Sequence, residues 1–122
     1  MILNSSEFGC NESIINPALR TLTNITYSSD DHTQMILNAG ALKPILCYLS
    51  HNSRIVRYET LMVVSNILAG TSEQVEMCIQ TGVLQKVIEI MQNAKQDRDG
   101  KLEREACWAI SNAASKKEPH QA

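Results

Sequence analysis

The stretch that decides the fold is Gly100-Lys-Leu-Glu-Arg-Glu-Ala-Cys-Trp-Ala-Ile-Ser-Asn-Ala-Ala-Ser115, which has the pattern of one helix. Residues three or four apart share a face of a helix, so Trp108, Asn112 and Glu105 are expected to point to the same side. A broad apolar stripe at helical spacing predicts the side that faces a core. Its residues are Leu102, Ala106, Cys107, Ile110 and Ala113. An aromatic ring, an amide and a carboxylate on one face are suited to hold a cationic side chain together with its backbone.

The same pattern occurs twice earlier in the chain. The run Tyr58-Glu-Thr-Leu-Met-Val-Val-Ser-Asn66 aligns with Arg104 to Asn112, and Pro17-Ala-Leu-Arg-Thr-Leu-Thr-Asn24 is a third copy. The asparagines that end the first two copies, at 24 and 66, are 42 residues apart. Further pairs at this offset are Gly40 and Gly82, Leu42 and Leu84, Leu46 and Ile88, and Leu49 and Met91. A period in the low forties with purely helical patterning is typical of armadillo or HEAT repeats.

Length and composition limit the remaining possibilities. The 122 residues suit one domain, which holds about two and a half such units, and a net charge of −2 offers no basic face for nucleic acid. The sequence contains no run of 18 apolar residues, so no membrane span is expected. The polar residues that directly follow Met1-Ile-Leu argue against a signal peptide.

Cysteine and histidine positions indicate no chemistry. The cysteines, Cys10, Cys47, Cys78 and Cys107, fit no zinc spacing, and the last three lie in apolar helical patterns, which predicts reduced cysteines in the core. The histidines, His32, His51 and His120, have no partner at catalytic or ligand spacing and are expected at the surface. We find no nucleophile–base pair, phosphate-binding loop or metal cluster, so neither an enzyme nor a cofactor is expected.

Taken in order, the chain divides into repeats with an order of short, second and long helix. We expect an irregular lead-in over 1–13, armadillo repeats over 14–115 and a frayed tail over 116–122. Within the repeats, 14–27 is the third helix of a partial unit, and 31–70 and 72–115 are full units. The expected helices are 14–27, 33–38, 41–50, 54–70, 72–80, 83–93 and 100–115. Three helices per unit favour armadillo over the two-helix HEAT unit, so the predicted fold is an all-α right-handed armadillo superhelix.

Three segments within 14–115 carry a resemblance to a known family. They are Glu-Ala-Cys-Trp-Ala-Ile-Ser-Asn-Ala (105–113), Pro-Ala-Leu-Arg-Thr-Leu-Thr-Asn-Ile (17–25) and Asp-Asp-His-Thr-Gln-Met-Ile-Leu-Asn-Ala-Gly-Ala-Leu (30–42). They resemble the armadillo repeats of importin-α (karyopherin-α), the adaptor that binds nuclear localisation signals. The family's recognition device is Trp-x-x-x-Asn on the third helix. The Arg20-x-x-x-Asn24 variant resembles the unit that opens the family's C-terminal, minor binding segment, so the chain is expected to be equivalent to that half.

The resemblance implies a binding site for a basic peptide, extended across the third helices. By this resemblance, Asn24, Asn66 and Asn112 match the amides that hold the peptide backbone, and Trp108 matches the tryptophan wall. Glu59 and Glu105 match the acidic positions ahead of that wall, and Ser65 matches a polar groove position. Asp30 and Thr33 match the pair that holds a key lysine, and Arg20 matches an arginine that orients a neighbouring carboxylate. Met62 stands where the middle tryptophan of the family is expected, which predicts lower affinity.

Plainer interpretations stand beside these roles. A lone tryptophan on a helix often belongs to the core, and the two glutamates could be solvated helix charges. Asparagine in mid-helix could form an inter-helix hydrogen bond that fixes stacking, an alternative left open for Asn24.

Two function hypotheses follow from these observations. The first is an importin-α-like adaptor, or a fragment of one, that binds basic nuclear localisation signals for import and is found in cytoplasm and nucleus. The basic segment that engages importin-β is not expected in this chain, nor is a nucleic-acid or membrane partner. The alternative is a truncated armadillo scaffold that docks on other armadillo or karyopherin proteins without cargo import.

Overall fold

The computed structural model describes residues 12–115, and residues 1–11 and 116–122 lie outside the description. The described part is helical throughout its regular structure, without a strand. Its helices are α2 (Glu12–Ser28), α3 (Asp30–Asn38), α4 (Leu42–Tyr48), α5 (Arg54–Leu68), α6 (Ser72–Gln80), α7 (Val83–Gln96) and α8 (Gly100–Ser115). The predicted all-α class is therefore confirmed. None of the helices described is long and apolar enough to cross a membrane.

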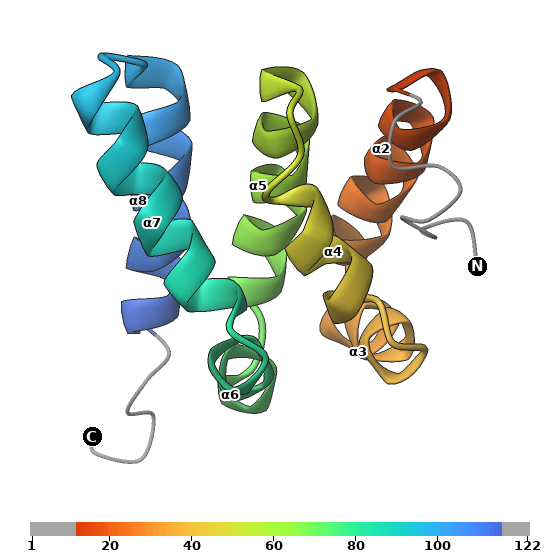
Figure 1. Cartoon of the computed structure of the whole chain (residues 1–122). Coiled ribbons are helices and arrows are strands. Elements are labelled where there is room, and N and C mark those ends of the chain that lie inside the picture. The colour runs from red at the N-terminus through yellow and green to blue at the C-terminus, as the bar shows by residue number, and fades with distance from the viewer. Residues whose placement is uncertain (1–11, 116–122) are drawn as a thin grey trace.

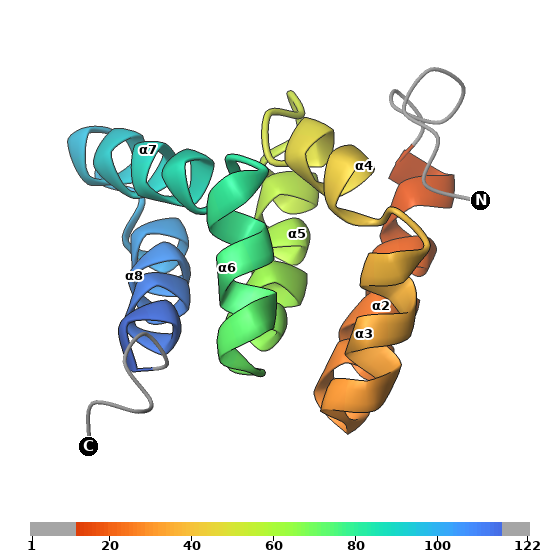
Figure 2. The same cartoon turned by 90° about the horizontal axis from the view of Figure 1, so that it is seen from below.

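The helices form two units of three, α3–α4–α5 and α6–α7–α8, which follow the single helix α2. The long helices α2, α5 and α8 lie side by side, with α5 in the middle (Figure 1). The first helices of the units, α3 and α6, lie together on one side of this row (Figure 2). The second helices, α4 and α7, contact each other and link the units. This arrangement places equivalent positions of successive third helices next to each other.

Polar residues and glycines define where the helices begin and end. The side chains of Ser29, Ser53 and Thr71 accept hydrogen bonds from the first-turn amides of α3, α5 and α6, as N-cap residues do. Thr71 forms a full capping box with Gln74, so the N-cap residue of α6 is Thr71 and the helix begins at Ser72, as predicted. Gly40 and Gly82 have φ values of 90° and 89°, a conformation that glycine adopts without steric cost.

Several helix ends differ from expectation by one to three residues, and those of α2 and α7 are examples. Helix α2 begins at Glu12, two residues earlier than predicted; the rest of the expected lead-in and the expected tail lie outside the described residues. Helix α7 runs to Gln96, although a loop was predicted from residue 94. Ala94 is only 2% exposed and continues the buried face of Ile90 by one turn, and Lys95 and Gln96 are good helix formers. The turn between α7 and α8 is therefore shorter than predicted.

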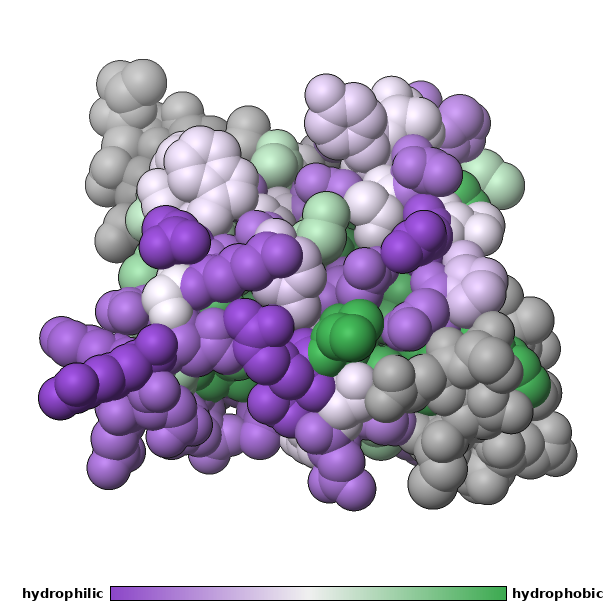
Figure 3. All heavy atoms as spheres, turned by 90° about the horizontal axis from the view of Figure 1, so that it is seen from above, coloured by the Kyte–Doolittle hydropathy of each residue, from purple (hydrophilic) through white to green (hydrophobic). Residues whose placement is uncertain are grey.

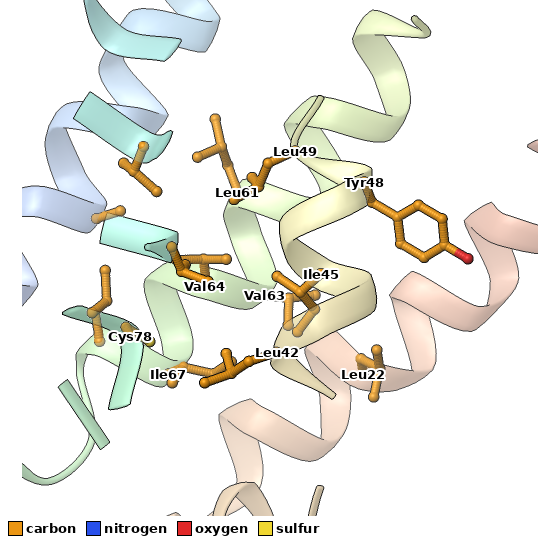
Figure 4. Close-up of a cluster of buried hydrophobic side chains, with 14 of the residues drawn as sticks. Leu22, Leu42, Ile45, Tyr48, Leu49, Leu61, Val63, Val64, Ile67 and Cys78 are labelled. Atoms are coloured by element: carbon orange, nitrogen blue, oxygen red, sulfur yellow. The ribbon is translucent and has the colours of Figure 1, made fainter. Parts of the chain in front are cut away.

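The hydrophobic core lies between the second and third helices. Ile45, Leu49, Leu61 and Val64 are fully buried there (Figure 4). Tyr48 is also buried and points toward α2, and desolvation raises the pKa of its hydroxyl. Because α5 packs against α8 and α4 contacts α7 of the next unit, neither unit encloses a core alone. This mutual burial is the property that makes repeat arrays cooperative between neighbours.

The prediction that the helical cysteines belong to the core is correct for one of the three. Cys78 is buried, and desolvation raises the pKa of its thiol to about 12. Cys47 and Cys107 are exposed, and Cys10 lies outside the described residues. In α8 the buried stripe includes Ala109 in place of Cys107. The predicted apolar face of α8 was therefore rotated relative to the buried face, because small alanines lie on both sides of the helix and hydrophobicity does not distinguish the two sides.

Candidate functional site

The surface of interest belongs to the row of third helices. Figure 3 views the molecule from above the orientation of Figure 1, where hydrophilic side chains cover much of the surface and small hydrophobic patches lie among them. Trp108 on α8 is 62% exposed, although tryptophan is usually well buried. The alternative that Trp108 belongs to the core is therefore wrong, and an exposed indole lies one turn from Asn112.

The two later asparagines bridge neighbouring third helices by the same contact. Asn112 Nδ2 donates to the backbone oxygen and to Oγ of Ser65, both at 3.0 Å, and so links α8 to α5. Asn66 Nδ2 donates to the backbone oxygen of Thr23 and to Oγ1 of Thr26, both at 3.2 Å, and so links α5 to α2. Each acceptor carbonyl belongs to the residue just before the preceding asparagine of the series. The inter-helix hydrogen bond weighed as the plainer role is thus present for Asn66 and Asn112.

The first asparagine has a different environment. Asn24 is exposed, and no hydrogen bond joins its side chain to another described residue. It lines an open hollow of about 300 Å³ between α2 and α5, together with Arg20, Thr23, Glu59 and Met62. Arg20 Nε lies 3.9 Å from Glu59 Oε1, and the Arg20 side chain is 75% exposed. The neighbouring carboxylate expected for Arg20 is therefore Glu59, and an ion pair this long and exposed contributes little stability.

The two glutamates differ in their surroundings. Glu105 is half-buried one turn before Trp108, and desolvation raises the pKa of its carboxyl. Glu59 has its cationic partner within the chain, whereas no cationic group of the described residues forms an ion pair with Glu105. An unpaired, partly desolvated carboxylate beside an exposed indole is a favourable place for an incoming ammonium or guanidinium group.

Three predicted site residues are not equally accessible. Thr33 is 1% exposed, and its hydroxyl donates to the backbone oxygens of Ser29 and Thr26. Ser65 is 3% exposed and accepts the amide of Asn112. Asp30 is exposed, and its backbone oxygen accepts a hydrogen bond from Gln74. The structure therefore separates the predicted lysine-binding pair, because Thr33 supports helix packing and only Asp30 reaches solvent.

Sequence reasoning missed two aromatic residues on the third helices. Tyr27 is 81% exposed and lies one turn beyond Asn24 on α2, seven residues from Arg20 and so on nearly the same face. Tyr58 on α5 is covered by Lys101 of α8, whose Nζ lies 4.7 Å from the ring centroid. The helical offset from Arg20 could have identified Tyr27. The contact between Tyr58 and Lys101 depends on inter-helix geometry and had no signal in the sequence.

A second hollow, of about 350 Å³, lies at the other end of the third helices. The turn before α5 contributes Asn52 to its lining, and α7 and the turn after it contribute Lys86 and Asp99. The charges around it are mostly satisfied within the chain: Arg54 forms a two-point ion pair with Asp99, and Arg57 donates to backbone carbonyls. Among residues 12–115, no group of three His, Cys, Asp or Glu could hold a metal ion.

Comparison with known proteins supports the predicted resemblance. Importin subunit alpha-1a of Oryza sativa subsp. japonica is 36% identical over 73 residues, which are 59% of this chain and 14% of that protein. Importin subunit alpha-3 of Arabidopsis thaliana is 36% identical over 97 residues, 80% of this chain and 18% of that protein. The chain thus spans less than a fifth of the length of either relative. No family model matches the chain.

Solved structures agree with the sequence similarity. A designed armadillo repeat protein in complex with the peptide (KR)4 superposes with a TM-score of 0.80 at 31% identity, over 93% of this chain and 44% of that chain. Another designed armadillo repeat protein gives a TM-score of 0.77 at 28% identity, over 90% of this chain and 43% of that chain. Both the predicted fold and the predicted resemblance are confirmed: this chain is an armadillo-repeat array, similar in sequence to the importin α subunits.

Proposed function

We propose that the row of third helices binds an extended Lys- and Arg-rich peptide of the nuclear-localisation-signal type, as part of an importin-α-like adaptor for nuclear import. The observation that carries the proposal is the exposure of Trp108 beside a carboxylate that lacks a cationic partner. A 62% exposed indole gains much less from burial than a core tryptophan does, so a binding role accounts for its position better than packing does.

The chemistry at this position suits a lysine or arginine side chain. The indole face of Trp108 would contact the aliphatic stem and the charge, a cation–π contact worth roughly 0.5–2 kcal/mol. Glu105 would accept a charge-assisted hydrogen bond from the cationic head. Ionised Glu105 is disfavoured by desolvation in the free protein, and an arriving cation would relieve that cost. The two residues are three positions apart on α8 and therefore act on the same peptide side chain or on adjacent ones.

The α2–α5 side of the surface offers weaker recognition. Met62 provides apolar contact in place of an aromatic ring, and Glu59 already faces Arg20 at 3.9 Å. We therefore assign the main cation-binding position to α8 and a secondary one to Asn24, Glu59 and Met62. Exposed Asp30 adds negative charge near the α2–α3 turn. This assignment agrees with the expected equivalence to a minor binding segment. The similarity to importin α subunits supports a role in cytoplasm and nucleus.

A titration with a basic peptide tests the proposal. Fluorescently labelled (KR)4, the peptide bound by a designed armadillo relative, is expected to bind with an affinity that falls as salt is raised. Trp108→Ala should weaken binding roughly 2- to 30-fold, the range that corresponds to a cation–π contact. Met35→Ala is the matched control, because Met35 is 66% exposed but lies on α3, on the other side of the row. Equal affinities of wild type and Trp108→Ala would contradict the proposal.

A second function has one specific observation in its favour. The amide nitrogens of Asn66 and Asn112 hold neighbouring helices together, which is what a scaffold without cargo would retain. In that case the array would dock on another armadillo or karyopherin protein and ignore (KR)4. Light scattering over a range of concentrations, with and without (KR)4, separates the two: a monomer that binds peptide supports the adaptor, and peptide-independent association supports the scaffold.

A further inference from the structure

The two ends of the row of third helices carry the two halves of the contact that joins its members. Within the row, Asn112 of α8 donates to Ser65 of α5, and Asn66 of α5 donates in the same way to α2. No third helix precedes α2 among the described residues, and its Asn24 is exposed without a hydrogen-bond partner there. At the other end of the row, α8 carries exposed Ser111 at the place that Ser65 has on α5 (Figure 1). A donor is therefore unused at one end and an acceptor at the other.

The side chains near Ser111 are exposed, although their counterparts in the first unit are buried. Leu61 of α5 is fully buried, whereas its counterpart in α8, Cys107, is exposed. Leu37 of α3 is 4% exposed, and its counterpart in α6, Ile79, is 37% exposed. These positions are covered in the unit that another described unit follows and open in the unit that none follows. The surface made of Ile79, Cys107 and Ser111 therefore has the positions against which a further armadillo unit packs.

The opposite end, on α2, shows the matching pattern. Thr21 lies one turn before Asn24 and is exposed. Its counterparts on α5 and α8, Val63 and Ala109, are fully buried. Residues three apart share a side of a helix, so Thr21 lies on the same side as the unused donor. Helix α2 thus presents the side with which α5 and α8 pack on the third helix before them.

We infer that a second copy of this chain docks end to end, with its α2 packed on α8 in the place of a following third helix. Asn24 Nδ2 of the second copy donates to the backbone oxygen and to Oγ of Ser111, as Asn112 does to Ser65 within the chain. The two ends select a second copy as the occupant, because one presents the donor and the other the acceptor of the contact that the chain already uses twice. Such a head-to-tail contact uses two different surfaces, so copies join into open chains and not into a closed pair.

This contact goes beyond the proposed peptide binding and does not depend on it. Met62, the counterpart of Trp108 on α5, lines an open hollow although α8 packs beside α5. Trp108 should therefore stay accessible when α2 of a second copy packs beside α8. The contact lacks the first and second helices of a complete unit and is small, so we expect association only at high protein concentration. Peptide binding by the monomer at low concentration still decides between the two proposed functions.

The molar mass of the full 122-residue chain, measured by light scattering in reducing buffer, tests the inference. The mass should rise steadily with concentration. Thr21→Arg and Cys107→Arg each place a charge on one of the two end surfaces and should raise the concentration needed for association roughly tenfold or more. Gln85→Arg is the control, because Gln85 and its counterpart Lys43 are both exposed and no junction between units covers this position. All three variants change exposed residues and should melt at the wild-type temperature.

A mixture of the two end variants gives the sharper test. The Thr21→Arg protein keeps a working α8 end and the Cys107→Arg protein a working α2 end, so an equal mixture should form a one-to-one pair that grows no further. Adding Asn24→Asp to the Cys107→Arg protein should weaken this pairing roughly fivefold or more, because an oxygen then replaces the donor that faces the Ser111 carbonyl. A wild-type chain that stays monomeric at every concentration would overturn the inference. So would end variants that fail to pair when mixed, or a pairing that Asn24→Asp leaves unchanged.

Discussion

Gly70, just after α5, occupies a position with no room for a side chain. A Cβ atom there would lie 2.1 Å from Gln74 Oε1, 3.1 Å from the Ile67 backbone oxygen and 3.2 Å from Asp30 Oδ1. The φ angle of Gly70 is not positive, so close approach and not backbone conformation requires the glycine. Gly70→Ala must therefore move the Gln74 side chain, which is 1% exposed.

The cost follows from what Gln74 holds. Its Oε1 accepts from the Thr71 amide in the capping box of α6, and its Nε2 donates to the Asp30 backbone oxygen and to Gln34 Oε1. These bonds fasten α6 to α3 of the preceding unit. Disturbing these three bonds at ~1 kcal/mol each, with an overpacking cost of ~1–3 kcal/mol, predicts a destabilisation of about 4–6 kcal/mol. That is a large share of the ~5–15 kcal/mol typical of a domain.

Urea unfolding followed by circular dichroism measures this loss. Gly100→Ala is the control, because its Cβ would meet only the flexible end of the exposed Arg104 side chain at 3.2 Å, and alanine favours a helix start over glycine. The control should unfold at the same urea concentration as wild type or slightly above it. In a Gln74→Ala background, Gly70→Ala should cost much less, since the clash partner is gone. A wild-type midpoint for Gly70→Ala, or an unchanged cost in that background, would refute the reasoning.

Three further predictions use the ionisable groups. The ion pair with Arg54 lowers the pKa of Asp99 to about 2, below the ordinary ~3.9. The pair therefore stabilises the fold above pH ~4, and this stabilisation is lost as the pH falls toward 2. Asp99→Asn should reduce the loss of stability between pH 4 and pH 2, and the control Asp97→Asn should leave it unchanged. Burial raises the pKa of Glu105, so ionisation of its carboxyl lowers the stability of the fold as the pH rises above the ordinary ~4.3. Glu105→Gln should therefore unfold at a higher urea concentration than wild type at pH 7 but not at pH 4. The same variant should bind (KR)4 more weakly. Burial raises the pKa of Cys78 to about 12. Iodoacetamide at pH 8 should therefore modify exposed Cys47 and Cys107 within minutes and Cys78 only in urea, as measured by peptide mass mapping.

The fold could be predicted from the sequence because several signals coincided. The 42-residue spacing of asparagines and glycines, helical periodicity and turn residues all pointed to three-helix units. The predicted helices differ from the observed ones mainly at their ends, where Ala94 extended α7. Periodicity and turn residues depend on residues close together in the chain, so they can be recognised in the sequence without the folded structure.

The site could be predicted only in part, because the fate of a polar side chain depends on the helix beside it. Trp108 was expected on the surface and lies there. Thr33 and Ser65 were assigned to a ligand but are buried, since each has a hydrogen-bond partner that only the packed array provides. Helical spacing gives the direction of Asn66 and Asn112 but not whether a carbonyl lies within reach. The small hydroxyl residues just before each asparagine are the one hint in the sequence.

The bridging amides also have a direction along the chain: in both cases the donor comes from the later helix and the acceptor from the earlier one. Domains and repeats leave the ribosome N-terminal end first. Each acceptor carbonyl is thus already synthesised when the matching donor emerges. An array built on this rule can lengthen one unit at a time, with each newcomer aligned on its predecessor.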